Sequence, residues 1–203
     1  MSVTKLDLRK QLKPLYFPRG VELVQVPPMK YIMVDGGGQP GGESFQQAME
    51  VIYNLSYTLK FRAKKLLKKD YTVMAPEGLW WTKTGKIDLK KPNDWLWTLM
   101  AMVPDFVTNR MFFDAVEEVR RKKKPPGLDR ARLESFDEGY CVQTMHVGPY
   151  SAEAESIAKM DAYAREHGYV MVGKHHEIYL GDPRRAAPSK LKTVIRHPVA
   201  EGP

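Results

Sequence analysis

The four tryptophans of the chain gather in one short stretch. Trp80 and Trp81 are adjacent, and Trp95 and Trp97 are two residues apart, so the second pair shares one face of a strand. Tryptophan offers a large flat apolar surface that suits stacking on planar ligands and contact with cations. Met100 lies close by in the sequence, and methionine adapts to varied ligand shapes. The cluster therefore fits the wall of a ligand pocket as well as it fits ordinary core packing.

A second candidate for chemistry is Glu177, in the segment HHEIYL at residues 175–180. Alternation along a strand puts His175, Glu177 and Tyr179 on one face. A carboxylate between an imidazole and a phenol could oppose the charge of a cationic ligand, or act as a general base. An exposed carboxylate on a solvated strand face is the alternative that the local sequence leaves open.

Metal and disulfide chemistry are not expected. His175 and His176 are adjacent and face opposite ways in a strand, and Cys141 is the one cysteine. The other histidines, His146, His167 and His197, have no ligand-like spacing. The sequence also lacks the G-x-S-x-G motif of serine hydrolases and the order of a phosphate-binding loop. We therefore expect neither a metal nor a cofactor.

The composition is that of a folded globular protein. The chain has 203 residues, of which 43% are hydrophobic and 28% charged, enough to bury a sizeable core. No stretch approaches the roughly 18 apolar residues of a spanning helix, and the N-terminal residues lack an apolar signal region. We expect a cytoplasmic protein with no membrane partner.

The basic charge is concentrated where helices are expected to end. The formal net charge is +8, and its main clusters are Lys64 to Lys69 and Arg120 to Lys124. Cations near a helix C-terminus are favoured by the helix dipole. No nucleic-acid-binding motif accompanies the charge, so we expect no specific nucleic-acid partner.

Hydrophobic periodicity predicts the elements that position these residues. Residues 1–20 read as an extended lead-in, because Pro14 and Pro18 break helices. A helix is expected from Ser44 to about Lys69, and another after Thr108. The second half predicts a helix over 151–167. The strands fall near residues 21–26, 31–34, 71–74, 77–81, 95–103, 140–147, 169–173, 175–180 and 191–199.

The two halves look like diverged copies of one β-α-β-β unit. The segment MKYIMVDGGG precedes the first helix as CVQTMHVGPY precedes the other, and similar short strands follow both helices. We expect repeats over about 21–130 and 131–200, with a strand-helix insertion at about 85–125 in the first. The predicted fold is α+β, a curved antiparallel sheet with helices on one side and a ligand cleft between the halves.

Several segments of the chain resemble a known family. The segment HVGPY at 146–150, the segment EIYL at 177–180, and the later Asp182-Pro183 and LKT at 191–193 look like the GyrI-like small-molecule-binding domain. That family includes the effector-binding domains of multidrug-sensing transcription activators. PEGLWW at 76–81, Trp95-x-Trp97 and PDFVT at 104–108 resemble its stand-alone branch, and the match covers roughly residues 20–200.

The resemblance implies a pocket carboxylate that meets lipophilic cations, and Glu177 is the matching position. Stand-alone members are similar proteins that hydrolyse cyclopropane-bearing DNA-alkylating natural products, and in them a pocket Glu and Tyr assist water attack or protonation at the distal carbonyl. Glu177 matches that Glu, and Tyr179 or Tyr140 matches the Tyr. Gyrase binding, known in other members, has no support here. The residues expected around the ligand are Glu177, Tyr179, Tyr140, Tyr150, Trp80, Trp81, Trp95, Trp97, Met100 and Phe106.

Two functions follow from this resemblance. The first is a free-standing binding protein for planar aromatic, often cationic compounds. The alternative is a hydrolase that opens the cyclopropane ring of such natural products in the same cleft. Because binding and hydrolysis would use the same residues, the sequence does not separate them.

Overall fold

The computed structural model describes residues 4–84 and 91–202. Part of the predicted insertion, residues 85–90, lies outside this description. The chain combines helices with antiparallel sheets, so the predicted α+β class is confirmed. It divides into two compact units, one of residues 1–11 and 29–136, the other of residues 12–28 and 137–203. No helix in the described part is long and apolar enough to cross a membrane.

The first unit contains a four-stranded antiparallel sheet. Its central strands are rich in buried apolar residues, which favours strands covered by other elements. In order across the sheet, the strands are β5 (Pro76–Thr82), β6 (Trp95–Val103), β3 (Met29–Gly37) and β7 (Ala131–Phe136). A separate parallel pair joins β1 (Thr4–Leu6) to β4 (Lys69–Tyr71).

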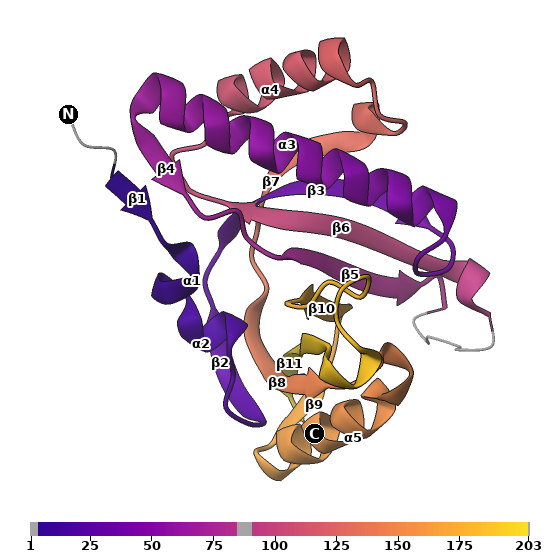
Figure 1. Ribbon diagram of the computed structural model, residues 1–203. Coiled ribbons are helices and arrows are strands. Elements are labelled where there is room, and N and C mark those ends of the chain that lie inside the picture. The colour runs from indigo at the N-terminus through magenta and orange to yellow at the C-terminus, as the bar shows by residue number, and fades with distance from the viewer. Residues whose placement is uncertain (1–3, 85–90, 203) are drawn as a thin grey trace. The chain divides into compact units, whose positions relative to one another are not determined.

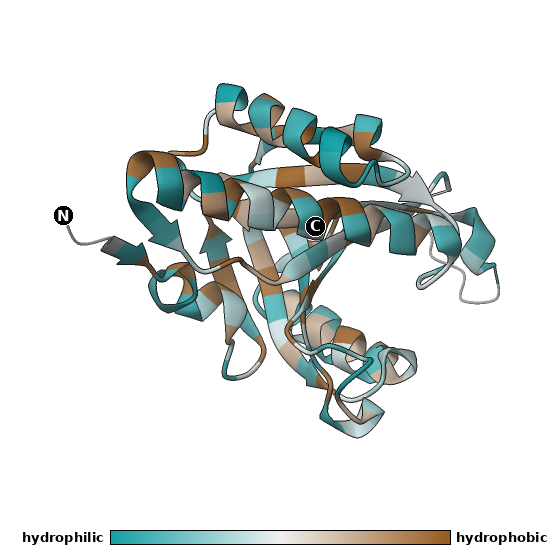
Figure 2. Ribbon diagram, turned by 45° about the horizontal axis from the view of Figure 1, so that its top comes forward, coloured by the Kyte–Doolittle hydropathy of each residue, from teal (hydrophilic) through white to brown (hydrophobic). Residues whose placement is uncertain are grey.

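Two amphipathic helices belong to this unit. The long helix α3 (Glu43–Leu67) packs on β3 and β6, and α4 (Asn109–Lys122) packs on α3 (Figure 1). Brown and teal residues alternate along both helices in Figure 2, because apolar side chains recur once per turn. As predicted, Thr108 caps α4, its hydroxyl accepting a hydrogen bond from the Met111 amide. The N-cap of α3 is Gly42, and not Ser44 as the sequence predicted.

The second unit contains another antiparallel sheet, covered by α5 (Glu153–Glu166). A core of Val142, Met160, Ala164 and Ile195 joins this helix to the sheet. In order, the strands are β2 (Glu22–Val26), β8 (Gly139–Val147), β11 (Lys192–Glu201) and β10 (His175–Tyr179). The short strand β9 (Tyr169–Met171) pairs with the far end of β11, which continues past Pro198.

Both units contain the expected β-α-β-β order, as β3-α3-β4-β5 and as β8-α5-β9-β10. Their limits differ from the predicted repeats, because residues 12–28 group with the second unit. The N-terminal segment also differs from an extended lead-in. It forms β1, α1 (Leu8–Gln11) and α2 (Lys13–Tyr16), and Pro14 lies in the first turn of α2, where proline is tolerated. Residues 1–3 of that lead-in lie outside the described chain.

Candidate functional site

Strand alternation places Glu177 and Tyr179 on the face of the second sheet that α5 covers. Glu177 lies opposite Ile195 on β11, and Ile195 packs against α5 in the core. Side chains at directly paired positions share a face, so Glu177 points to the same side. His176 points to the other side. The alternation predicted for residues 175–179 therefore holds in the structure.

His175 is the centre of a hydrogen-bonded chain on this face. Its Nδ1 lies 2.9 Å from His197 Nε2, and its Nε2 lies 3.0 Å from Glu177 Oε1. The other side of the His197 ring bonds the backbone carbonyl of Val172. A carbonyl only accepts, so His197 donates to Val172 and accepts from His175. Burial and the positive charge of His175 lower the pKa of His197 to about 4, which keeps His197 neutral.

Glu153 brings a second carboxyl to the site from the first turn of α5. This residue is 5% exposed. Burial, then the charge of Glu177 and a hydrogen bond to it, raise the pKa of Glu153 to about 9. Glu153 therefore holds its proton at neutral pH and donates it to Glu177. Its Oε2 lies 4.0 Å from His175 Nε2, and its Oε1 has no hydrogen-bond partner among the described residues.

Glu177 is the ionised member of the carboxyl pair. Burial acts to raise its pKa, but hydrogen bonds from His175, Tyr179 and Glu153 and the charge of His175 lower it overall. Its side chain keeps 14% of its surface exposed. One neutral acid and one carboxylate thus lie a single hydrogen bond apart, each held in its state by different neighbours.

Two tyrosines border the carboxylate. Tyr179 donates a hydrogen bond to Glu177, and its ring makes an edge-to-face contact with Tyr150 at 5.9 Å between centroids. Burial and the charges of Glu177, Glu153 and Asp182 raise the pKa of Tyr150 to about 12. Tyr150 therefore stays protonated at neutral pH.

Tyr140 has a different neighbour. It makes an edge-to-face contact with Tyr169 on β9, at 5.3 Å between centroids. Of the two tyrosines left open by the sequence, Tyr179 is the one that contacts Glu177.

The four tryptophans lie in the first unit, and their side chains differ in how much surface they expose. Trp97 and Met100 have no exposed surface, and a Cβ added at Gly36 would lie 2.1 Å from the Trp97 ring. These two side chains are core residues. Trp80 is also buried and stacks on Phe45 of α3 at 5.8 Å.

The remaining aromatic candidates of the first unit are Trp81, Trp95 and Phe106, and all three are partly exposed. The edge of Trp95 meets Trp80 at 5.9 Å, and Phe106 meets Tyr71 in the same manner. Trp81 and Trp95 thus keep surface that a planar ligand can contact, which the buried Trp97 does not.

Sequence reasoning missed Glu153 and the role of His197. An acidic residue in the first turn of a helix is common, because it complements the helix dipole, so Glu153 carries no signal of its own. His197 was considered only as a metal ligand. Neither residue is close in sequence to Glu177, and only the fold brings them together.

Glu153, His175 and Glu177 also offer donor atoms that all lie within 4.8 Å of one another, a spacing that a divalent cation could use. Hydrogen bonds and the proton on Glu153 already link these atoms. We therefore read them as proton donors and acceptors.

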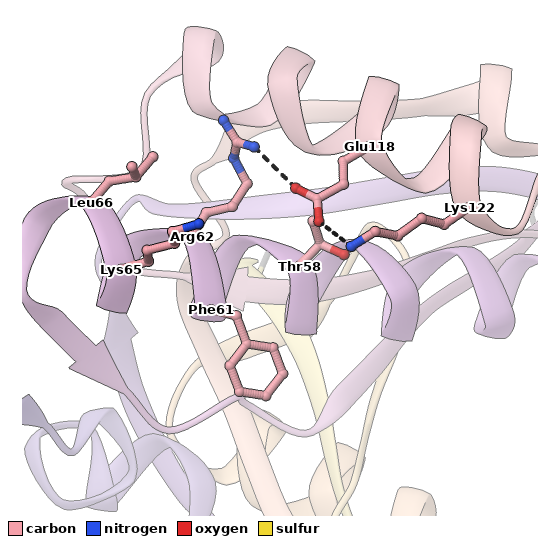
Figure 3. A pocket seen from close by; sticks show the side chains of 7 residues that line it. All are labelled: Thr58, Phe61, Arg62, Lys65, Leu66, Glu118 and Lys122. Carbon is pink, nitrogen blue, oxygen red and sulfur yellow. Dashed lines mark hydrogen bonds and ion pairs between the residues drawn. The ribbon is translucent and has the colours of Figure 1, made fainter.

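A groove of about 360 Å³ lies between α3 and α4 in the first unit (Figure 3). Glu118 is central to it, bonded to Arg62 at 3.0 Å and to Lys122 at 2.6 Å. These cations lower the pKa of Glu118, so its carboxylate is already neutralised. None of the predicted site residues borders the groove, which is lined by Thr58, Phe61, Arg62, Lys65, Leu66, Glu118 and Lys122.

The opposite face of the second sheet carries a separate buried ion network. Glu138 bonds His176 Nδ1 at 2.9 Å and Arg196 at 3.1 Å. Gln143 accepts from the same guanidinium, and Arg196 Nη2 donates to the Leu15 carbonyl at 2.7 Å. All three charged side chains are at most 2% exposed, so this network is structural.

Solved structures of other proteins are similar to this chain. A conserved uncharacterized protein of Listeria innocua is 41% identical, with a TM-score of 0.91 over 96% of this chain and 100% of that one. A hydrolase of Listeria innocua is 42% identical, with a TM-score of 0.89 over 97% of this chain and 100% of that one. The C-terminal domain of EcmrR, 11% identical, has a TM-score of 0.60 over 89% of this chain and 97% of that one, which shows a shared fold alone.

No curated protein sequence matches the chain. The model of the GyrI-like small-molecule-binding domain matches residues 20–200, nearly the whole length. That span includes most of each unit and every residue of the Glu177 network. The chain belongs to the GyrI-like small-molecule-binding domain family.

Proposed function

We propose that this protein binds planar small molecules at Glu177 and adds water to electrophilic members of that class, with cyclopropane-bearing DNA-alkylating compounds as substrates. The observation that carries the proposal is an ionised, partly exposed carboxylate that accepts a hydrogen bond from Tyr179, whose ring contacts the neutral phenol Tyr150. Support also comes from Listeria innocua proteins described as hydrolases, which are 38–42% identical to this chain.

Glu177 acts as the general base. The water oxygen bonds to the ring CH₂ carbon while Glu177 takes a water proton, and the carbon–carbon bond of the cyclopropane breaks. The electron pair moves through the conjugated ring to the distant carbonyl oxygen, which takes a proton from solvent and becomes a phenol. Hydrogen bonds from His175 and Tyr179 hold Glu177 in place for this step.

Binding of planar cations without reaction is the second candidate, and the aromatic rings beside Glu177 favour it. Glu177→Gln keeps the size and removes the charge. It is expected to weaken a planar cation by roughly 1–3 kcal/mol, the range for a charged hydrogen-bonding group, and to leave a neutral isostere nearly unchanged. Calorimetry with both ligands measures the difference, and equal losses would mean that the charge of Glu177 does not select cations.

Mass spectrometry separates hydrolysis from binding. The protein is incubated with one cyclopropanoid, and the ring-opened product that has gained one water is quantified. We expect this product with the unmodified protein and with the control Glu155→Gln, because Glu155 is exposed and bonds Lys159 on the surface of α5. Glu177→Gln is expected to reduce it at least about 100-fold, the low end for general base catalysis. If the compound stays unchanged but binds in calorimetry, binding alone is supported. If the compound is not hydrolysed and does not bind, the proposal is overturned.

A further inference from the structure

A row of exposed aromatic side chains runs along α3, on the side of the helix that faces away from the sheet. Tyr53, Tyr57 and Phe61 are four residues apart and are 38%, 47% and 60% exposed. Leu55 and Leu59, two residues before and after Tyr57, are fully buried, because two residues turn a helix by about 200°. Single exposed apolar residues are normal on a monomer, whereas a continuous row of large rings marks an interaction surface.

The middle of the row is already ordered. The rings of Tyr57 and Phe61 stack with 6.3 Å between their centroids and 30° between their planes. An ordered aromatic pair loses little side-chain entropy when a partner covers it, which favours binding at this place. None of the three aromatic residues takes part in the proposed function.

The charges along the row have opposite signs at its two ends. Glu50 comes seven residues before Tyr57 and Lys64 seven residues after it, and both are exposed. Seven residues make about two turns, so both charges lie in line with the row. The helix dipole does not account for Glu50, because that effect is confined to the first turn and Glu43 is the first residue of α3.

This order of residues complements itself when a second copy of α3 lies alongside in the opposite direction. With Tyr57 at the two-fold axis, Tyr53 meets Phe61 of the second copy, and Glu50 meets Lys64 of the second copy. Two-fold symmetry makes each of these contacts occur twice. We propose that the outer face of α3 packs antiparallel against the same face of a second copy, which makes this protein a symmetric dimer.

A nucleic acid or an anionic membrane fits this face less well. Both present continuous negative charge, so they need cations along the whole contact. Glu50 lies at one end of the row and would repel them. At the other end, Asp70 lies 3.7 Å from Lys64 and reduces its free charge. A second copy is the partner whose charges complement both ends.

The length of α3 limits how tight this contact can be. The helix has 25 residues and is therefore about 37 Å long, and the row from Glu50 to Lys64 covers about 20 Å of it. One helix packed against its copy lies at or below the low end of stable interfaces, roughly 1,200 Å². We therefore expect a dissociation constant in the micromolar range.

Sedimentation equilibrium of the full chain at micromolar concentrations measures the dimer. Tyr57→Glu places two carboxylates at the two-fold axis and should weaken the dimer at least about 30-fold, as expected for loss of a central contact residue. Phe113→Glu is the matched control on α4, because Phe113 is also exposed. Its side chain is turned by about 100° from Asp114, which bonds Arg62 of α3, so this variant should associate like the unmodified protein. A thermal unfolding midpoint shows that each variant is folded.

Charge reversal tests the antiparallel direction. Glu50→Lys and Lys64→Glu, each alone, bring like charges together at both ends of the contact and should weaken the dimer roughly 10-fold, from two exposed ion pairs. An equal mixture of the two variants should associate as strongly as the unmodified protein, because every mixed pair again joins opposite charges. A misfolded variant could not recover in this way.

Three results would overturn the inference. The first is a protein that stays monomeric throughout the micromolar range. The second is a dimer that neither Tyr57→Glu nor the charge reversals weaken, because another surface would then hold it together. The third is a monomer that sediments with phosphatidylserine vesicles, which would assign the row to a lipid surface.

Discussion

The proton on Glu153 links the candidate site to the stability of the fold. The pKa of this carboxyl is raised from 4.5 to about 9, chiefly by burial. Between those values the folded protein holds a proton that the unfolded chain releases, so stability declines as pH rises from 4.5 to about 9. A side chain at position 153 that donates a hydrogen bond to Glu177 at every pH would remove this decline in stability.

Glu153→Gln supplies such a side chain, because its amide can donate to Glu177 at any pH. We expect its melting temperature, relative to the unmodified protein, to be higher at pH 8.5 than at pH 5 by at least about 3 °C, or about 1 kcal/mol for a chain of this size. Calorimetric scans at the two values measure this. The exposed Glu155→Gln should show no such pH-dependent difference. A constant offset for Glu153→Gln would mean that Glu153 is ionised in the folded state.

Gly36 is a second position where one residue decides a local structure. An added Cβ would lie 2.1 Å from the buried Trp97 ring, so that side chain or the strand would have to move. Overpacking of this kind typically costs about 1–3 kcal/mol, and we expect that loss for Gly36→Ala in urea unfolding. Gly20→Ala is the matched control, because a Cβ there meets nothing within 4 Å. Equal stability of both variants would contradict the close contact.

At the scale of elements, the buried ion network fixes the second sheet. Glu138 bonds both His176 and Arg196, and these two cations lower its pKa to about 2 against the effect of burial. Removing the charge leaves two buried cations without their counter-charge. Glu138→Gln should therefore lower the free energy of unfolding by about 3–5 kcal/mol, measured in urea.

The control for this prediction is Glu134→Gln, on β7, whose side chain is 54% exposed. Exposed ion pairs contribute little, so its change should stay below about 1 kcal/mol. Similar losses in the two variants would show that the Glu138 network contributes no more than a surface pair.

The elements with strong periodicity were predictable from the sequence. The helix after Thr108 and the strand at 95–103 appear as expected, because an apolar stripe and a capping residue are local signals. Strand β7 was missed because none of the residues of Ala131–Phe136 is buried, so the segment lacks the long apolar run that marks the strand at 95–103. For α5, the expected start at Ser151 precedes the observed start at Glu153, since a short 3₁₀ turn at Tyr150–Ala152 comes first.

Only some of the site residues could be predicted from the sequence, for a similar reason. Glu177 and Tyr179 follow from alternation within one strand and from the family resemblance. Glu153 and His197 depend on contacts between elements that are distant in sequence, which no local pattern encodes. The same holds for the tie between Arg196 and the Leu15 carbonyl, which helps to group residues 12–28 with the second unit.

At the scale of the whole molecule, the net charge of +8 predicts weak attraction to polyanions. The basic run at the end of α4 is partly neutralised, because Arg120 pairs with Asp129 and Lys122 pairs with Glu118. Any DNA binding should therefore lack sequence preference and fall steeply between about 50 and 200 mM salt. Fluorescence anisotropy with two unrelated duplexes measures this, and sequence-specific binding that persists at the higher salt would refute it.

The pairing of the outer strands gives the duplication a particular history. β2 precedes β3 in the chain yet pairs with β8, while β7 precedes β8 yet pairs with β3. Each repeat thus gives its leading strand to the other copy. A single ancestral copy that exchanged its first strand in this way would have existed as a strand-exchanged homodimer, and gene fusion would have joined its two subunits. Cutting the present chain after Arg130 should yield two fragments that fold only when mixed, because the first would lack β7 beside β3 and the second would lack β2 beside β8.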